Sequence, residues 1–129
     1  MERADQHTVA TAIICMDGRV QEPVAEYLKL KLGVAFVDMI TDAGPDGVLA
    51  QMNDYETIRA IKKRVNISVQ RHGSKHIAVV GHHECAGNPV DIATHHSHIR
   101  SGVQNIRIWY PDAAVFGLWV NEKWGVEEV

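Results

Sequence analysis

The sequence lacks the features that mark several large classes of protein. Thirteen Lys and Arg residues against sixteen Asp and Glu residues leave a net charge of −3, without the basic excess that nucleic-acid-binding domains direct at phosphates. No apolar run approaches the roughly 18 residues that a membrane span needs. The opening stretch MERADQHTV mixes charges of both signs and has no signal-peptide apolar core. We therefore expect a cytoplasmic protein without nucleic-acid or membrane partners.

Cysteine is equally scarce, because the chain holds only Cys15 and Cys85. In a reducing compartment, thiols serve metal binding or catalysis more often than a crosslink. Eight histidines among 129 residues add potential metal ligands. Two alternatives remain open at this point. The cysteines could be inert core thiols, or they could form a redox pair, although the sequence has no C-x-x-C motif.

The chain has the length of one ordinary domain, and we expect residues 1–129 to form a single one. Nearly continuous apolar runs predict buried strands at 8–15, 34–41 and 76–81. Between them the sequence predicts two helices, at 23–32 and at 49–71. Pro23 would occupy the first turn of the first helix, and apolar residues three or four apart line one face of the second.

The remaining segments complete the expected pattern. The glycine-rich stretch 42–47 reads as a loop. A weak helix at 90–100, strands at 106–109 and 114–120, a turn at 121–125 and a short tail strand follow. This alternation predicts an α/β fold with a central, mostly parallel sheet of four to five strands and flanking helices. Sites in such sheets form at the carboxyl ends of the strands.

Two short motifs fall at that position. Cys15 ends the first predicted strand, and His82 and Cys85 follow the third in the spacing H-x-x-C. We expect both motifs at one rim of the sheet, on adjacent strands. Together they supply a Cys₂His set that leaves a fourth position open, as a catalytic zinc requires. Thiolate and imidazole favour zinc over magnesium or calcium, and zinc acidifies a bound water into a nucleophile.

Other polar residues near these motifs have more than one reading. Asp17 and Arg19 could form a bidentate pair that orients the metal-bound water, or a plain surface ion pair. His83 could be a proton shuttle or a solvated side chain. His95 and His98 could belong to a second metal site, but a solvated helix face is favoured.

The sequence also resembles a known family. CMDGR at 15–19 resembles the C-x-D-x-R motif of β-class carbonic anhydrases, residues 72–87 resemble the family's third strand and H-x-x-C-(G/A)-G loop, and residues 114–126 resemble its last strand and hairpin. The resemblance implies zinc held by Cys15, His82 and Cys85, with Asp17 and Arg19 as the catalytic dyad. It implies reversible hydration of carbon dioxide to bicarbonate by a zinc-bound hydroxide, and a homodimer or higher homo-oligomer. In some members the aspartate instead leaves the arginine and ligates zinc.

Two departures from the family pattern keep other functions open. Thr41-Asp42-Ala43-Gly44 stands where the family usually has Arg-Asn-Ala-Gly, and the chain is shorter than typical members. An acid near the expected site could weaken anion binding. One alternative is a catalytically silent zinc-binding relative. Another is a hydrolase of a different small electrophile, such as carbonyl sulfide or carbon disulfide.

Overall fold

A computed structural model describes residues 8–129, so most of the amino-terminal stretch inspected for a signal peptide lies outside the described residues. The elements, in chain order, are β1 (Val9–Cys15), α1 (Gly18–Leu32), β2 (Phe36–Asp42), α2 (Pro45–Gln51), α3 (Tyr55–Asn66), the π-helical segment η1 (Ile67–Arg71), β3 (His76–His82), α4 (Ile92–Trp109), β4 (Ala114–Val120) and β5 (Val126–Glu128).

The strands form one sheet in the order β2-β1-β3-β4-β5. β2, β1, β3 and β4 run parallel, and only β5 pairs antiparallel, with β4. β1 pairs with β2 along its whole length, from Val9 opposite Phe36 to Cys15 opposite Asp42. The predicted α/β architecture with a mostly parallel sheet is therefore confirmed.

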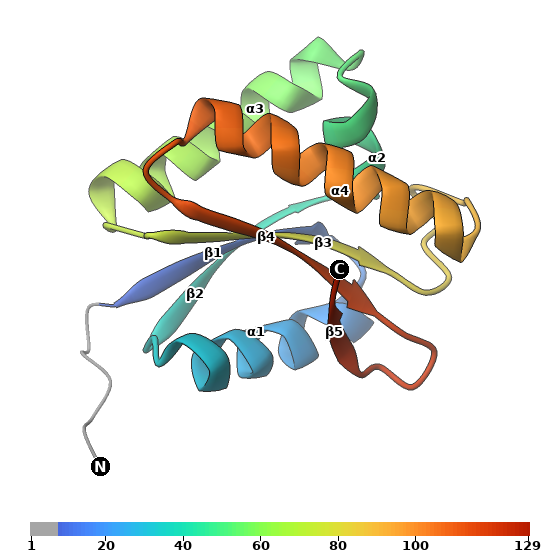
Figure 1. Ribbon diagram of the computed structural model, residues 1–129, viewed down its shortest axis with the longest axis horizontal. Coiled ribbons are helices and arrows are strands. Elements are labelled where there is room, and N and C mark those ends of the chain that lie inside the picture. The colour runs from blue at the N-terminus through green and yellow to red at the C-terminus, as the bar shows by residue number, and fades with distance from the viewer. Residues whose placement is uncertain (1–7) are drawn as a thin grey trace.

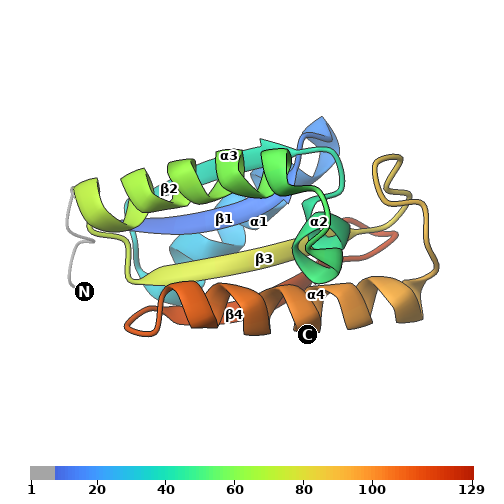
Figure 2. The ribbon, with the colours of Figure 1, turned by 90° about the horizontal axis from the view of Figure 1, so that it is seen from above.

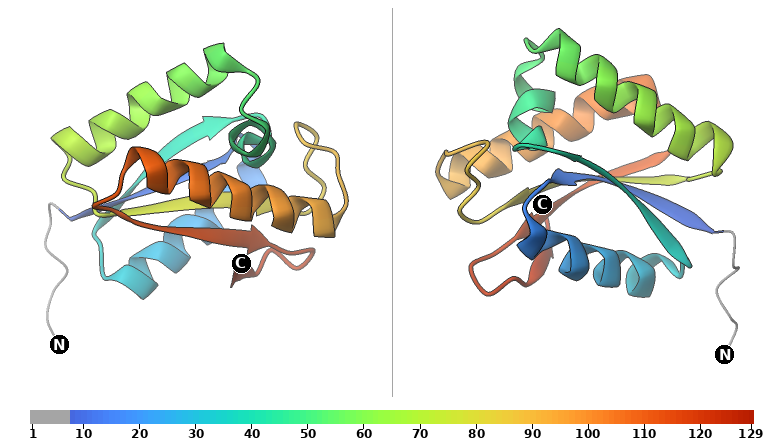
Figure 3. Two further views of the ribbon diagram at one scale, coloured as in Figure 1. Left: turned by 45° about the horizontal axis from the view of Figure 1, so that its top comes forward. Right: turned by 180° about the vertical axis from the view of Figure 1, so that it is seen from behind.

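Helices cover both faces of this sheet (Figure 1). α1 lies on one face, and α2, α3 and α4 lie on the other (Figure 3). Alternate strand residues point to opposite layers, as the pleat requires. Ile13 and Val79 belong to the core beneath α3 and α4, whereas Ile14 and Val80 pack with the α1 residue Val24. β1 and β3 are thus apolar on both sides, which explains their continuous apolar runs.

The single helix predicted for 49–71 is wrong, because the chain forms separate segments there. α2 begins at Pro45, inside the predicted loop, and ends at Gln51, where Met52 caps it with a φ of +55°. α3 then starts afresh after Asp54, whose carboxylate accepts the Thr57 N–H at 3.1 Å. The apolar spacing continues across this break, so periodicity alone did not reveal it.

Two further element predictions are corrected by local chemistry. α1 begins at Gly18 rather than Pro23, because the Asp17 side chain caps it by accepting the Arg19 N–H at 2.9 Å. The strand predicted at 106–109 is the last turn of α4, and Ile106 is buried in the core beneath it. A four-residue apolar run fits a buried helix turn as well as a strand.

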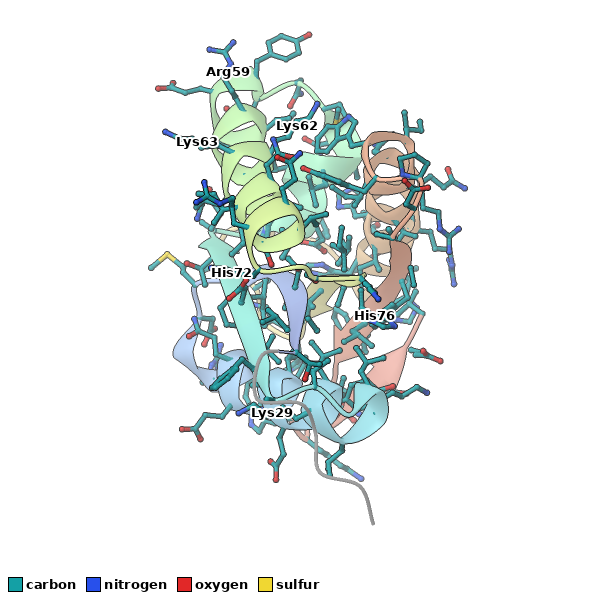
Figure 4. The ribbon with its side chains drawn as sticks, turned by 90° about the vertical axis from the view of Figure 1, so that its left-hand side faces the viewer. Lys29, Arg59, Lys62, Lys63, His72 and His76 are labelled. Atoms are coloured by element: carbon teal, nitrogen blue, oxygen red, sulfur yellow. The ribbon has the colours of Figure 1, made fainter. Side chains whose placement is uncertain are left out.

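The amino-terminal end of the sheet carries charged and imidazole side chains. Figure 4 views this side and shows His72 and His76 near the strand ends, with Arg59, Lys62 and Lys63 on α3. Lys62 lies 4.9 Å from the ring centre of Trp109, a cation–π distance. Across residues 8–129, no helix combines the length and the apolar character that crossing a membrane would take.

Candidate metal centre

The two motifs meet at the carboxyl ends of β1 and β3, which are adjacent and parallel. Cys15 is the last residue of β1 and His82 the last of β3. In Figure 2 both strands point to the same end of the molecule, where α2 and the loop after β3 also lie. Glu84 has a φ of +56° in the turn after β3, a left-handed conformation that suits a tight reversal. That turn brings Cys85 back beside His82, so the predicted rim is confirmed.

Cys15, His82 and Cys85 form a compact, buried group. One ligand atom from each lies within 4.8 Å of the others, and the side chains are 4%, 1% and 5% exposed. The two Sγ atoms are 3.9 Å apart. Two sulfurs bound at about 2.3 Å to a tetrahedral zinc would lie roughly 3.8 Å apart. Within residues 8–129, no other His, Cys, Asp or Glu residues cluster this way.

The imidazole of His82 is oriented to offer one nitrogen to this group. Its Nδ1 lies 2.7 Å from the carbonyl oxygen of His83, so Nδ1 carries the proton and Nε2 keeps its lone pair. Nε2 is buried and has no hydrogen-bond partner among the described residues. Buried nitrogens without partners are uncommon, and a metal-binding histidine usually donates its other N–H to a carbonyl or carboxylate. The three residues therefore fit a zinc ion.

The surroundings of the thiols favour the charged form of one of them. A hydrogen bond from Cys85 lowers the pKa of Cys15 well below its usual range, and further hydrogen bonds come from the backbone N–H groups of Gly44 and Asp17. The same bond to Cys15 raises the pKa of Cys85, which accepts a hydrogen bond from the Asn88 N–H. The loops around the site thus direct N–H groups at both sulfurs, and thiolate is the form that binds metal.

Asp17 and Arg19 form the bidentate pair that their spacing suggested. Arg19 Nε lies 3.1 Å from Asp17 Oδ1, and Arg19 Nη2 lies 2.7 Å from Oδ2. The hydrogen bonds from the Arg19 side chain lower the pKa of Asp17 to about 2. Both side chains reach solvent, with exposed fractions of 21% for Asp17 and 47% for Arg19. Asp17 faces Arg19 and is not part of the three-residue ligand group.

Comparison with known proteins gives the family. A sequence model described as "Putative carbonic anhydrase" matches residues 5–129. The chain belongs to this carbonic anhydrase family. No protein of curated function matches it in sequence.

Solved structures agree with this membership at the level of the fold. One is a tetrameric β-carbonic anhydrase from Sordaria macrospora, with a TM-score of 0.53 and 16% identity over 99% of this chain and 82% of that one. Another is the β-carbonic anhydrase CafA of Aspergillus fumigatus, with a TM-score of 0.51 and 14% identity over 96% and 76% of the two chains. At these identities the likeness establishes a β-carbonic anhydrase fold.

Two partners of Arg19 escaped the sequence analysis. The guanidinium carbon of Arg19 lies 4.7 Å from the ring centre of Trp124, in the hairpin between β4 and β5. Arg19 Nη1 also lies 3.5 Å from a carboxylate oxygen of Glu84. Glu84 neighbours the ligand Cys85 in sequence, which was an available signal. Trp124 carried none, because only the fold brings the hairpin to the end of β1.

The favoured prediction for His95 and His98 was wrong. His95 is 2% exposed, not solvated, and its Nδ1 lies 2.6 Å from Oδ2 of the buried Asp46. His98 Nδ1 lies 3.0 Å from the amide nitrogen of Asn88. α4 packs against α2 here, so His95 faces the interior and His98 is partly buried. They do not form a metal-binding group among the described residues.

Thr41 and Asp42, which replace the usual Arg-Asn of the family, both contact Arg64 of α3. Arg64 Nη1 donates to the Thr41 carbonyl at 3.1 Å, and Arg64 Nη2 lies 4.0 Å from Asp42 Oδ2. The Ala43 N–H donates to the other Asp42 oxygen at 2.8 Å. The acid that replaces the family asparagine is thus engaged locally by an arginine and a backbone N–H.

Proposed function

We propose that this protein is a zinc-dependent carbonic anhydrase that interconverts carbon dioxide and bicarbonate. The observation that carries the proposal is the buried Cys15–His82–Cys85 group with its unpartnered Nε2 atom, in a chain of this family. Zinc, when bound there, supplies the Lewis acidity that lets water lose a proton near neutral pH.

The residues around the group have separable tasks. Cys15, His82 and Cys85 supply the donor atoms, and their burial shields that side of the site from bulk water. Asp17 is ionised at neutral pH, and the hydrogen bonds from Arg19 hold its pKa at about 2. Its carboxylate can therefore accept a hydrogen bond from the attacking water and orient it. Arg19 is held in turn by Trp124 and Glu84, which limits its movement as it positions Asp17.

A homodimeric or higher assembly and a cytoplasmic location form part of the same proposal. The Sordaria macrospora relatives are described as tetrameric. Met16, next to a ligand, is 65% exposed, and Phe36 on the edge strand β2 is 56% exposed. Large apolar side chains at an unpaired sheet edge suit burial against a second copy of the chain.

Stopped-flow hydration of carbon dioxide by zinc-loaded protein, from about pH 6.5 to 9, tests the activity. We expect a rate that rises with pH. A pair of substitutions on one strand supplies the structural control. His82→Gln, at the carboxyl end of β3, should remove both zinc and turnover, whereas His76→Gln, at its amino end, should retain both.

Two outcomes would contradict the proposal. If His82→Gln kept full zinc and full turnover, the ligand assignment would be wrong. If the wild-type protein bound zinc but did not hydrate carbon dioxide at any pH, it would be a silent relative or a hydrolase of another electrophile. Assays with carbonyl sulfide and carbon disulfide would then separate those two cases.

A further inference from the structure

A second acid–base pair lies behind the metal ligands, on the α4 side of the sheet. Asp46, in the first turn of α2, is fully buried. Both of its oxygens are engaged: Oδ2 lies 2.6 Å from His95 Nδ1, and Oδ1 accepts the Asn88 amide at 3.1 Å. Removing a carboxylate from water costs free energy. The burial of Asp46 therefore indicates a role beyond packing.

Residues 82–87, here called the ligand loop, carry His82 and Cys85. The Asp46 carboxylate adjoins both ends of this loop. Before the loop, a Cβ added to Gly81 would lie 2.7 Å from Asp46 Oδ2, so the carboxylate presses against the backbone next to His82. After the loop, Asp46 holds the side chain of Asn88, whose backbone N–H is hydrogen-bonded to Cys85. The segment that carries His82 and Cys85 is therefore fixed at both ends by one side chain.

The loop that precedes α2 packs closely against the ligand loop. A Cβ on Gly44 would lie 2.6 Å from the Gly87 backbone, and one on Gly87 would lie 2.5 Å from the Ala43 backbone. Gly44 also donates its N–H to Cys15. A shift of either loop would move an N–H group that serves a ligand sulfur, so the two loops and the ligand geometry change together.

We propose that the buried Asp46–His95 pair is the positioning element of the metal centre, because it fixes through Asn88 the loop that presents His82 and Cys85. The inference rests on the proposed function insofar as that function places zinc on these ligands. Asp46 and His95 do not contact the ligand atoms themselves. They act on the metal by keeping its donor atoms in place before it binds, as the outer partners of ligands do at other metal sites.

The chain offers a chemically similar but more exposed control pair, Asp38 on β2 and His72, whose side chains are 28% and 49% exposed. Asp38 Oδ2 lies 2.6 Å from His72 Nδ1, the same separation as in the Asp46–His95 pair. The same oxygen accepts a second hydrogen bond, from the Ser68 hydroxyl at 2.7 Å. Asp38→Asn therefore removes an acid bonded to a histidine but lies away from the ligand loop, whereas Asp46→Asn makes the same chemical change beside it.

The experiment compares wild type, Asp46→Asn and Asp38→Asn as purified full-length chains. Zinc affinity is measured by competition with a chromophoric chelator, and the cobalt(II)-loaded forms are compared by their thiolate-to-cobalt and ligand-field absorption. We expect Asp46→Asn to weaken zinc binding about 10-fold or more and to alter the cobalt spectrum. Asp38→Asn should leave both readouts at their wild-type values.

Three results would overturn the inference: wild-type affinity and spectrum in Asp46→Asn, equal losses in both variants, or no zinc binding by the wild type, which would also overturn the proposed function. Zinc binding without carbon dioxide hydration would overturn the proposed function alone. Should Asp46→Asn not fold, Asn88→Ala decides, because it leaves the Asp46–His95 pair intact. A weakened affinity supports the proposal, and an unchanged one overturns it.

Discussion

Two acid–base pairs flank the same three ligands from opposite faces of the sheet. Asp17 and Arg19 lie on the α1 side with side-chain exposures of 21% and 47%, whereas Asp46 and His95, on the α4 side, are 0% and 3% exposed. The open pair reaches solvent and can change its contacts at little cost. The buried pair cannot move without disturbing the core around it. We therefore propose different roles for the two pairs, chemistry for the open one and positioning for the buried one.

The buried pair should dominate the stability of the fold. Asp46→Ala leaves His95 and Asn88 without their shared acceptor, and breaking a buried hydrogen-bonded pair costs about 3–5 kcal/mol. Asp17→Ala, on the exposed pair, should cost less, about 0.5–2 kcal/mol, because it removes the cap of α1 while solvent already screens the ion pair with Arg19. Urea unfolding of the metal-free proteins measures both. Equal losses in the two variants would remove the distinction between the pairs.

One glycine near each pair allows a sharper comparison of how tightly the two surroundings are packed. Gly87 belongs to the closely packed loops, where a Cβ would meet backbone at 2.5 Å, whereas a Cβ on Gly18, between Asp17 and Arg19, would meet nothing within 4 Å. We expect Gly87→Ala to cost about 1–3 kcal/mol of unfolding free energy, as overpacked sites do, and to weaken zinc binding. Gly18→Ala should fold as well as wild type, since alanine suits a helix better than glycine.

Thermal or urea unfolding, followed by chelator competition on the folded variants, checks this contrast. A Gly87→Ala protein with wild-type stability and zinc affinity would show that the two loops are not mechanically coupled. A destabilised Gly18→Ala protein would show that the open side is packed more tightly than its geometry indicates.

The grouping of the three candidate ligands could be predicted from the sequence because its signals are local. Cys15 stands at the end of an apolar run, and His82 and Cys85 are separated by one turn. The rule that sites form at the carboxyl ends of parallel strands then placed the two motifs together. The sheet followed from the same apolar runs, since strands covered on both faces have few polar residues.

The contact between Asp46 and His95 could not be predicted in the same way. His95 lies on α4 and Asp46 on α2, 49 positions apart, and their contact depends on how the two helices pack. A histidine-rich helix start favours a solvated face, and an aspartate in a glycine-rich stretch favours a turn. In the structure both His95 and Asp46 are buried. Their burial depends on how α2 and α4 pack, which the sequence pattern does not show. The break at Met52 was missed for a similar reason, because apolar spacing continues through it.

The smallest expected effect concerns the pH dependence of the open pair. The folded-state pKa of Asp17 is lowered from 3.8 to about 2 by Arg19, so its contribution to stability is present above about pH 4 and is lost as the pH falls toward 2. The small stability difference between wild type and Asp17→Asn should therefore be constant from neutral pH to about pH 5 and shrink below about pH 4. Urea midpoints at a series of pH values measure it, with Glu22→Gln on the exposed side of α1 as the control. If the difference grew with acidity, Arg19 would not be the group that holds Asp17 ionised, and the open pair would need a different assignment.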